Sequence, residues 1–339
     1  MATEGRILVT GGCGYIGSHT VVDLLENGFD VVSLDSLVRA SDDVLNGIEA
    51  ITGTRVENLR VDLCDLEDTR NAIRDAGPFD AVIHFAALKY VDESVREPLL
   101  YYRNNLDGLV NLLDVCSNQA IDHVVFSSSC SVYGNVDHLP VTEDTPFGTA
   151  ESPYAATKQM GERILTDAVT ASERMHTLIL RYFNPVGAHA SAHIGESPAT
   201  VPNNLVPRIT GTAAGRFQTL QVFGHDYPTR DGTCVRDYIH VSDIAHAHTL
   251  AVQHMLGGMD ERLDVLNLGS GTGVTVLEAI RAFERVTGQA LDHELTDRRA
   301  GDVVAVFADN SKARSVLGWT PTRDIDEMMR TAWAWEEGR

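Results

Sequence analysis

A short apolar run followed by spaced glycines constrains the fold of this chain more than any other feature. Residues 6–9 have the composition of a buried strand, and Gly11, Gly14 and Gly17 follow in a GxxGxxG pattern before a helical stretch that starts near Ser18. Glycines at this spacing permit a tight turn, let a phosphate approach the backbone, and let strand and helix pack closely. The pattern therefore predicts a strand-turn-helix unit that binds a phosphate group.

An acidic residue at the end of the next apolar run narrows the ligand. Asp35 follows residues 30–34 and stands 18 residues after Gly17, where a carboxylate can hold the ribose hydroxyls of an adenosine. A carboxylate at this place would also repel a 2′-phosphate, so the pattern favours NAD over NADP. A tight turn or a strand-end cap would explain one of these features, but not both at this spacing.

The first half of the chain alternates short apolar runs with amphipathic stretches. Residues 80–84, 123–126 and 177–180 are typical of further buried strands, and residues 106–118 are typical of a helix between two of them. Right-handed crossovers then give an α/β fold, in which helices cover both faces of a doubly wound parallel (Rossmann) sheet.

The sequence changes character near residue 185, and we expect a domain boundary there. Residues 1–185 are predicted to form the NAD-binding Rossmann domain, joined by a return segment near residues 236–258. Residues 186–339 are predicted to form a smaller mixed α/β lobe that binds the substrate, with apolar segments at residues 238–241 and 265–268.

The composition argues against two classes of partner. The formal net charge of -21 repels nucleic-acid backbones and anionic lipid, and no apolar run approaches a membrane span. The five cysteines form no CxxC pair and no leader segment is expected, which favours a cytoplasmic location. We therefore expect binding to neither nucleic acid nor membrane.

Tyr154 and Lys158 stand four residues apart in a helical segment, so they share one helix face. A phenol needs roughly three pKa units of help, or about 4 kcal/mol, to act as a base at neutral pH. An ammonium and an oxidised nicotinamide can supply it. The pair alone could be two residues on an exposed helix face, but Ser129 places a hydroxyl at the end of a predicted strand, where ligands bind in such sheets.

Longer motifs extend this pattern over nearly the whole chain. They lie at residues 9–19, 84–89, 126–129, 152–158, 181–188, 202–205, 223–229 and 235–241, of which 181–188 and 235–241 are the most specific. On these motifs the chain resembles the extended short-chain dehydrogenase/reductase family, and within it the nucleotide-sugar epimerases. The resemblance implies reversible C4 epimerisation of UDP-glucose and UDP-galactose through a transient 4-keto sugar and tightly bound NAD.

The resemblance also implies roles for individual residues. Tyr154 takes the proton of the 4-hydroxyl, Ser129 bonds the same hydroxyl, and Lys158 lowers the phenol pKa and holds the nicotinamide ribose. The implied cofactor contacts are Gly11, Gly14, Tyr15, Ile16, Gly17, Asp35, Ser36, Arg39, Asp62, Leu63, Phe85, Ala86, Ala87, Lys89, Asn104, Tyr154, Lys158, Tyr182 and Phe183. The implied substrate contacts are Lys89, Ser129, Tyr154, Asn184, Asn204, Leu205, Gln221, Phe223, Arg236, Arg299, Asp302 and Val306.

Val306 bears on which sugar is accepted. Relatives of narrow specificity often carry tyrosine at this position, and a smaller side chain leaves space for an acetamido group. The resemblance therefore predicts that UDP-GlcNAc and UDP-GalNAc are also interconverted. It further implies a homodimer that pairs helices near residues 92–116 and 154–170.

Two other functions stay open from the sequence. Nucleotide-sugar 4,6-dehydratases share the fold, but they add an Asp-Glu pair where this chain has Cys130 and Ser131. NAD(P)-sensing regulators without turnover usually lose the tyrosine or the lysine. No metal is expected, because His189 and His193 lack a nearby carboxylate, and residues 269–273 are expected to form a structural turn.

Overall fold

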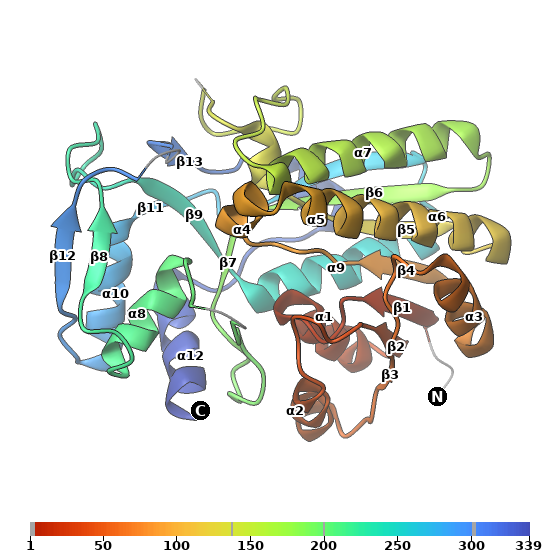
Figure 1. Cartoon of the computed structure of the whole chain (residues 1–339), viewed down its shortest axis with the longest axis horizontal. Helices are drawn as coiled ribbons and strands as arrows, with labels where there is room; N and C mark the ends of the chain where they lie inside the picture. Colours follow the sequence, from red (N-terminus) through yellow and green to blue (C-terminus); the bar gives the residue numbers. More distant parts are fainter. Residues whose placement is uncertain (1–3, 137, 199–200, 300–302) are drawn as a thin grey trace. The chain divides into compact units, whose positions relative to one another are not determined.

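The computed structural model describes residues 4–136, 138–198, 201–299 and 303–339, and Figure 1 traces the chain. Its contacts divide the chain into two compact units. Unit 1 comprises Met1–Gly134, Glu143–Tyr182 and Ala245–Leu266, and unit 2 comprises Asn135–Thr142, Phe183–Ile244 and Asn267–Arg339. Within the described ranges, every helix is too short or too polar for a transmembrane segment.

Unit 1 is built on a seven-stranded sheet with the strand order β10-β6-β5-β4-β1-β2-β3. The strands are β1 (Arg6–Thr10), β2 (Asp30–Leu34), β3 (Glu57–Leu59), β4 (Ala81–His84), β5 (His123–Ser129), β6 (His176–Tyr182) and β10 (Leu263–Leu268). Neighbours from β6 to β3 pair in parallel. This confirms the predicted doubly wound parallel sheet.

One predicted strand belongs to a different sheet from the one expected. Residues 265–268 were assigned to the smaller lobe, but β10 lies beside β6 at the edge of the large sheet. The assignment was wrong because an apolar run shows that a strand is buried, whereas its partner is chosen by contacts far away in the sequence.

Helices cover both faces of the large sheet. They are α1 (Tyr15–Glu26), α2 (Asp43–Thr52), α3 (Leu66–Ala76), α4 (Val91–Arg96), α5 (Pro98–Tyr102), α6 (Gly108–Gln119), α7 (Pro153–Ala171) and α9 (Val241–Leu256), with a π-helical turn at Arg103–Asp107 and a 3-10 turn at Cys130–Tyr133. Val82 and Val124 pack with Leu112 of α6 and Leu165 of α7 in one core cluster. Ile83 alternates to the opposite face and is fully buried there. In Figure 1, α7 runs beside the α4–α6 segment, and these helices are in contact.

Unit 2 is a mixed α/β unit with its own core. Its strands are β7 (Asn184–Val186), β8 (Leu220–Phe223), β9 (Val235–His240), β11 (Gly273–Thr275), β12 (His293–Thr296) and β13 (Ala305–Val306), and its helices are α8 (Leu205–Ala213), α10 (Val276–Thr287), α11 (Ser311–Leu317) and α12 (Ile325–Glu337). Strand β9 pairs with β7, β11 and β13, while β8 pairs with β12. Ile209 of α8, Ile280 of α10 and Met329 of α12 meet in the core.

The glycine-rich segment at residues 269–273 is a structural turn, as the sequence predicts. The carboxylate of Asp237 on β9 is fully buried and accepts hydrogen bonds from the backbone N–H groups of Ser270 (2.7 Å), Gly271 (3.2 Å) and Ala308 (3.0 Å). These amides are therefore engaged by the protein itself, and the turn joins β10 to β11.

Candidate active site

The glycine-rich turn between β1 and α1 forms a narrow cradle. Gly11 has a φ of +72°, and a Cβ atom at this position would lie 2.7 Å from the backbone nitrogen of Ala86. A Cβ at Gly17 would overlap the carbonyl oxygen of Gly11. Helix α1 begins at Tyr15, with Gly14 as its N-cap, so backbone amides and not a side chain define the start of the helix. Tyr15 and Ile16 are half-buried in its first turn.

Asp35 lies directly beyond β2, beside this cradle. Its two carboxylate oxygens accept hydrogen bonds from the backbone N–H groups of Cys13 (3.2 Å) and Leu37 (2.9 Å). Burial raises the pKa of this carboxyl, and the two hydrogen bonds oppose the increase. Ser36 is half-buried next to it. The cradle, the helix start and the carboxylate together fit an adenine dinucleotide.

Arg39 does not lie free near Asp35. Its guanidinium donates to Glu93 of α4 at 2.5 Å, and the phenol of Tyr101 donates to the same carboxylate at 2.9 Å. Because Arg39 is the basic residue nearest Asp35 in the loop that follows it, this ion pair bears on the choice between NAD and NADP.

The residues that are predicted to contact the adenine and nicotinamide parts of NAD differ in their burial and in their contacts. Asp62 is exposed, whereas Leu63 is buried in the hydrophobic core of unit 1, so its side chain serves packing. Phe85, Ala86 and Ala87 follow β4 and are half-buried. Lys89 is exposed, and its Nζ lies 5.8 Å from the centre of the Tyr15 ring. Asn104 lies in the π-helical turn and donates a hydrogen bond to Asn105 Oδ1 at 2.9 Å. Single π-helical turns between α-helical segments are frequent at functional sites.

Helix α7 carries Tyr154 and Lys158 to the end of β5. The Ser152 side chain caps this helix, and Pro153 occupies its first position. Lys158 is only 6% exposed, donates through Nζ to the carbonyl oxygen of Ser127 at 2.7 Å, and lies 5.0 Å from the centre of the Phe126 ring. The structure thus brings the predicted pair to the carboxyl end of the sheet.

Proton affinities in this cluster are set mainly by burial. Burial raises the pKa of the Tyr154 phenol to about 12, against a hydrogen bond with the Ser129 hydroxyl. Burial also lowers the pKa of the Lys158 ammonium to about 8, against the charge of Glu162. The protein's own groups therefore leave the phenol protonated and the ammonium largely charged at neutral pH. We expect the remaining activation of the phenol to come from the positive charge of an oxidised nicotinamide.

Further neutral groups line the same cluster. Tyr182 of β6 is 8% exposed and shares a hydrogen bond with the Ser127 hydroxyl, and burial raises the pKa of its phenol. His84 of β4 bonds Thr10 through Nδ1 at 2.8 Å, and burial beside Lys158 lowers its pKa to about 3. Tyr182 and His84 therefore add no charge beside Lys158 at neutral pH.

The sequence did not point to Ser127 or Glu162. Ser127 binds Lys158 through its carbonyl oxygen, a contact that no side-chain motif records. Glu162 stands one helical turn after Lys158, and that spacing was the available signal.

Three predicted substrate residues lie on neighbouring strands of unit 2. Asn184 on β7 pairs with Tyr238 of β9, and Val306 on β13 pairs with Arg236 of β9. Arg236 donates to the carbonyl oxygen of Val303 at 2.8 Å, and Asn184 donates to that of Asp237 at 3.1 Å. Strand pairing therefore groups residues that are 122 positions apart in the sequence, since β9 joins β7 to β13.

The other predicted residues of unit 2 are more accessible. Gln221 and Phe223 alternate with buried Val222 on β8, and Phe223 is 39% exposed. Asn204 occupies the N-cap position of α8 without a side-chain cap bond, and Leu205 begins the helix. Phe183 is buried, Arg299 is exposed, and Asp302 lies outside the described residues.

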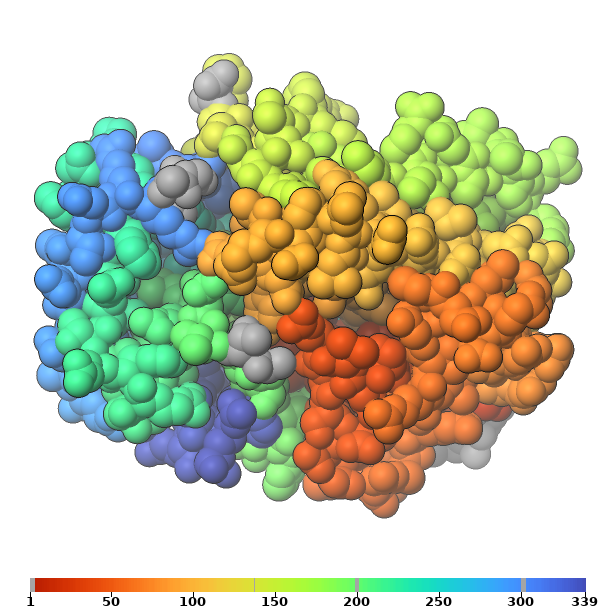
Figure 2. All heavy atoms as spheres, viewed as in Figure 1, coloured from red at the N-terminus to blue at the C-terminus, as the bar shows by residue number. Residues whose placement is uncertain are grey.

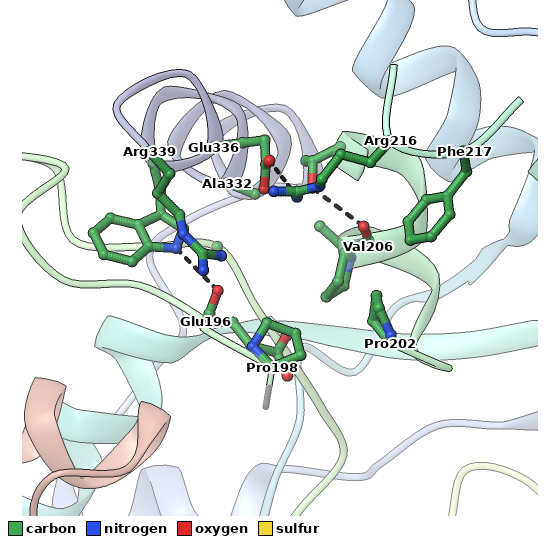
Figure 3. Close-up of a pocket in the computed structure, with 13 residues that line it drawn as sticks. Glu196, Pro198, Pro202, Val206, Arg216, Phe217, Ala332, Glu336 and Arg339 are labelled. Atoms are coloured by element: carbon green, nitrogen blue, oxygen red, sulfur yellow. Dashed lines mark hydrogen bonds and ion pairs between the residues drawn. The ribbon is translucent and has the colours of Figure 1, made fainter. Parts of the chain in front are cut away.

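A cavity of about 230 Å³ lies elsewhere in unit 2, between α8, α12 and the segment before α8 (Figure 3). Its walls include Pro202, Phe217 and Trp335, and the Arg216–Glu336 ion pair closes one side. The predicted substrate residues are not among the residues that line it, so it carries no part of the proposed chemistry. Among the described residues, no group of three or more His, Cys, Asp or Glu side chains is placed to hold a metal ion.

The glycine cradle, the strand-end carboxylate and the Tyr154–Lys158 pair on a Rossmann sheet define an NAD-dependent enzyme of the extended short-chain dehydrogenase/reductase class. The sequence profile described as GDP-mannose 4,6 dehydratase matches residues 8–332. The UDP-glucose 4-epimerase of Bacillus subtilis is 47% identical over 330 residues, which cover 97% of this chain and 96% of the relative. This chain therefore belongs to the UDP-glucose 4-epimerase family.

Solved structures of that family agree with the whole fold. The UDP-glucose 4-epimerase from Stenotrophomonas maltophila with bound NAD and formylated UDP-arabinopyranose matches with a TM-score of 0.96 and 45% identity, over 99% of this chain and 98% of that one. The enzyme from Bifidobacterium longum in complex with NAD+ and UDP matches with a TM-score of 0.93 and 42% identity, over 98% of each chain.

Proposed function

We propose that this protein interconverts UDP-glucose and UDP-galactose by inverting the configuration at C4, with NAD as a tightly bound cofactor. The observation that carries the proposal is the cluster at the end of β5, where Ser129 bonds Tyr154 and Lys158 binds the strand itself. The same unit holds the glycine cradle and Asp35. The hydroxyl of Ser129 that would bond the sugar, the proton acceptor Tyr154 and the cofactor cradle thus all belong to unit 1.

The chain's own residues manage the proton of the reaction. Tyr154 takes the proton from the 4-hydroxyl at its phenol oxygen and later returns one, while Ser129 orients the same hydroxyl. Lys158 favours the phenolate through its charge and would bind the nicotinamide ribose when the cofactor is present. When bound, NAD supplies reversible hydride acceptance from C4 and a positive charge close to Tyr154. The 4-keto sugar would rotate before the hydride is returned, which would invert C4. Because the hydride removed from C4 would go back to C4, the net redox change would be zero.

The 4-keto sugar can rotate in the site only if most of the binding affinity comes from contacts to the UDP portion of the substrate. We assign Arg236 and Arg299 to the pyrophosphate, because guanidinium groups bind phosphate oxygens through charge-assisted hydrogen bonds and the chain as a whole, with a net charge of -21, would otherwise repel them. Asn184 and Asn204 bind the nucleotide or its phosphates, and the exposed ring of Phe223 packs near the uracil. We assign Gln221 and Leu205 to the same nucleotide and Asp302 to the uridine ribose. Lys89 is proposed as a separate substrate contact.

The decisive experiment is incubation of the purified protein with UDP-galactose and no added NAD. We expect UDP-glucose to form, because the cofactor is retained and regenerated in each cycle. Nucleotide sugars separated by chromatography and NAD released by denaturation are both measured. Protein that contains NAD but leaves UDP-galactose unchanged contradicts the proposal, and formation of a 4-keto-6-deoxy product would indicate a dehydratase.

A broader substrate range is supported by Val306. Val306 pairs with Arg236 across strands β13 and β9 and is 7% exposed. A valine side chain occupies less space at this position than the tyrosine that relatives of narrow specificity often carry. We propose that UDP-GlcNAc and UDP-GalNAc are also substrates. Val306→Tyr should abolish turnover of the acetylated sugars and leave that of UDP-galactose within about threefold. Absence of turnover of UDP-GlcNAc by the unsubstituted protein refutes this extension.

A homodimer is supported by apolar side chains on α4 to α7. Val95 and Leu99 are 59% and 70% exposed. Val91, Val110 and Met160 are further large apolar residues of these helices that are exposed. Figure 2 shows α4–α6 and α7 as one continuous surface. A monomer rarely exposes many large apolar side chains on one face. Light scattering should give twice the mass of 36.9 kDa, and Leu99→Asp should shift the protein toward a monomer.

We also propose a cytoplasmic location. The five cysteines, all within the described part of the chain, form no disulfide bond in the structure, which suits a reducing compartment. Fractionation of the native cells, with antibody detection of the protein, tests this assignment.

A further inference from the structure

Helix α7 presents a third polar residue toward β5 beyond the catalytic pair. Tyr154, Lys158 and Glu162 stand at four-residue spacing, so they share one helix face. Each is bonded to one of three consecutive serines at residues 127–129: Tyr154 to the Ser129 hydroxyl, Lys158 to the Ser127 carbonyl, and Glu162 to the Ser128 hydroxyl. Glu162 therefore continues the row that contains the catalytic groups.

Glu162 forms a buried ion pair with Arg181 of β6. The two residues are 4% and 5% exposed, and Arg181 donates through Nε to Oε1 at 2.9 Å and through Nη2 to Oε2 at 2.7 Å. Arg181 also donates through Nη1 to the Tyr133 hydroxyl at 3.0 Å. The pair thus links α7, β5, β6 and the 3-10 turn after β5.

Stability alone is a weak reason for such a pair. Removing two charges from water costs several kcal/mol for each ion, so apolar residues of similar size would stabilise the fold as well or better. A buried Glu–Arg pair next to a catalytic lysine has a clearer use in controlling the charge of that lysine.

The other groups that face Lys158 supply no negative charge. His84 of β4 is neutral because its pKa is lowered to about 3, and Tyr154 and Tyr182 are neutral phenols at neutral pH. Arg181 of β6 is a cation. Among the described residues that face Lys158, Glu162 is thus the anion that opposes the effect of burial.

We propose that Glu162 is a positioning residue for Lys158. Its carboxylate, one helical turn further along α7, keeps the Lys158 ammonium charged in a buried site. Its bonds to Ser128 and Arg181 hold α7 in register with the end of β5. The consequence for catalysis rests on the proposed function, but the charge of Lys158 is measurable without turnover.

The small number of lysines makes that measurement direct. The chain contains three, Lys89, Lys158 and Lys312, so lysine labelled with ¹³C and ¹⁵N gives three side-chain signals in an NMR titration. Lys158→Arg assigns the signal of interest. In Glu162→Gln we expect the titration midpoint of Lys158 to fall by about one pH unit or more, because a carboxylate is lost and Arg181 is left unbalanced. Lys89 and Lys312 should not shift.

A second variant guards against failure of the first to fold, because Glu162→Gln leaves a buried cation without its partner. In Glu162→Gln/Arg181→Met both charges are removed, and the Lys158 midpoint should lie between those of the single variant and the unsubstituted protein. Glu278→Gln is the matched control, since Glu278 pairs with Arg230 on the surface of unit 2. It should leave the midpoint unchanged.

Activity provides a second readout. The alkaline limb of the kcat profile with UDP-galactose should move to lower pH in Glu162→Gln, in step with the NMR midpoint. A folded Glu162→Gln or double variant whose Lys158 midpoint equals that of the unsubstituted protein overturns the proposal. If the Lys158 midpoint shifts in Glu162→Gln while the unsubstituted protein itself has no epimerase activity, the role of Glu162 is supported and the proposed function is refuted.

Discussion

Units 1 and 2 hold their candidate functional side chains in different ways. In unit 1, Lys158 and Tyr182 are more than nine-tenths buried, and each is hydrogen-bonded to Ser127. In unit 2, Phe223 is 39% exposed and Gln221 is also exposed. Fixed, desolvated groups suit charge stabilisation and proton transfer, because groups that are already in place need no rearrangement at the moment of reaction. Accessible groups suit a nucleotide that enters and leaves. We therefore expect changes in unit 1 to lower kcat and changes in unit 2 to raise KM.

Tyr154→Phe gives the largest expected effect and tests the unit 1 side of this comparison. Removing the phenol oxygen removes the proton acceptor, so kcat for UDP-galactose should fall by about 10³-fold or more. KM and NAD content should stay close to those of the unsubstituted protein, because the ring and the glycine cradle remain. Initial rates and NAD released by denaturation are measured. A loss of kcat below tenfold would show that another group takes the proton.

The pKa of Tyr154 gives a second test of the same cluster. The phenol pKa is about 12 because of burial, and a nearby positive charge stabilises the phenolate. We therefore expect bound NAD+ to lower the Tyr154 pKa by about five units, which is the fall needed to ionise the phenol near neutral pH. By linkage, NAD+ binding should strengthen as pH rises from the NAD-bound pKa toward the pKa of the free protein.

Tyrosinate absorbance measured against pH, with and without NAD+, checks this expectation. Subtraction of the Tyr154→Phe titration isolates the one phenol. If the Tyr154 midpoint stays near 12 with NAD+ bound, the cofactor is not the source of the activating charge.

The two units also differ in how far the sequence predicted them. Strands such as β1, β4 and β5 were found because a buried parallel strand is a continuous apolar run, and the glycine pattern fixed the turn after β1. The partner of β10 was not found, because partner choice depends on contacts between residues distant in the sequence.

A similar limit applies to the candidate site. The Tyr154–Lys158 pair is visible because both residues lie on one helix, and helical spacing is readable from sequence. Arg181 and Glu162 meet only because β6 lies next to β5 beneath α7. No sequence spacing or motif predicts that these two residues form an ion pair. Local spacing therefore predicts groups on one element, while pairs across elements require the fold.

Arg236→Ala tests the unit 2 side of the comparison. Loss of charge-assisted hydrogen bonds to a pyrophosphate should raise KM for UDP-galactose by about 10- to 100-fold and leave kcat within about threefold. Arg298→Ala is the matched control, because Arg298 is an exposed arginine of the same unit that pairs with Asp226 at 2.7 Å. It should change neither constant by more than about twofold. A fall in kcat with unchanged KM would place Arg236 in the chemical step.

The smallest expected effect concerns the choice between NAD and NADP. It tests a part of unit 1 that lies outside the buried cluster around Lys158. Arg39 pairs with Glu93, whose carboxyl pKa would be raised by burial but is lowered overall by hydrogen bonds from Tyr101 and Arg39. Glu93→Gln should release Arg39 toward the ribose side of Asp35. Because partly exposed ion pairs are weak, we expect the affinity for NADP+ to rise only about threefold.

Fluorescence titration of NAD-stripped protein with NADP+ and NAD+ measures this change. The affinity for NAD+ should remain within about twofold, because Asp35 keeps its hydrogen bonds to Cys13 and Leu37. The double variant Glu93→Gln/Arg39→Ala should return NADP+ binding to its original level, since the released guanidinium is removed. Equal gains in the single and double variants would mean that Arg39 does not reach the 2′-phosphate, and that Asp35 alone sets the preference for NAD.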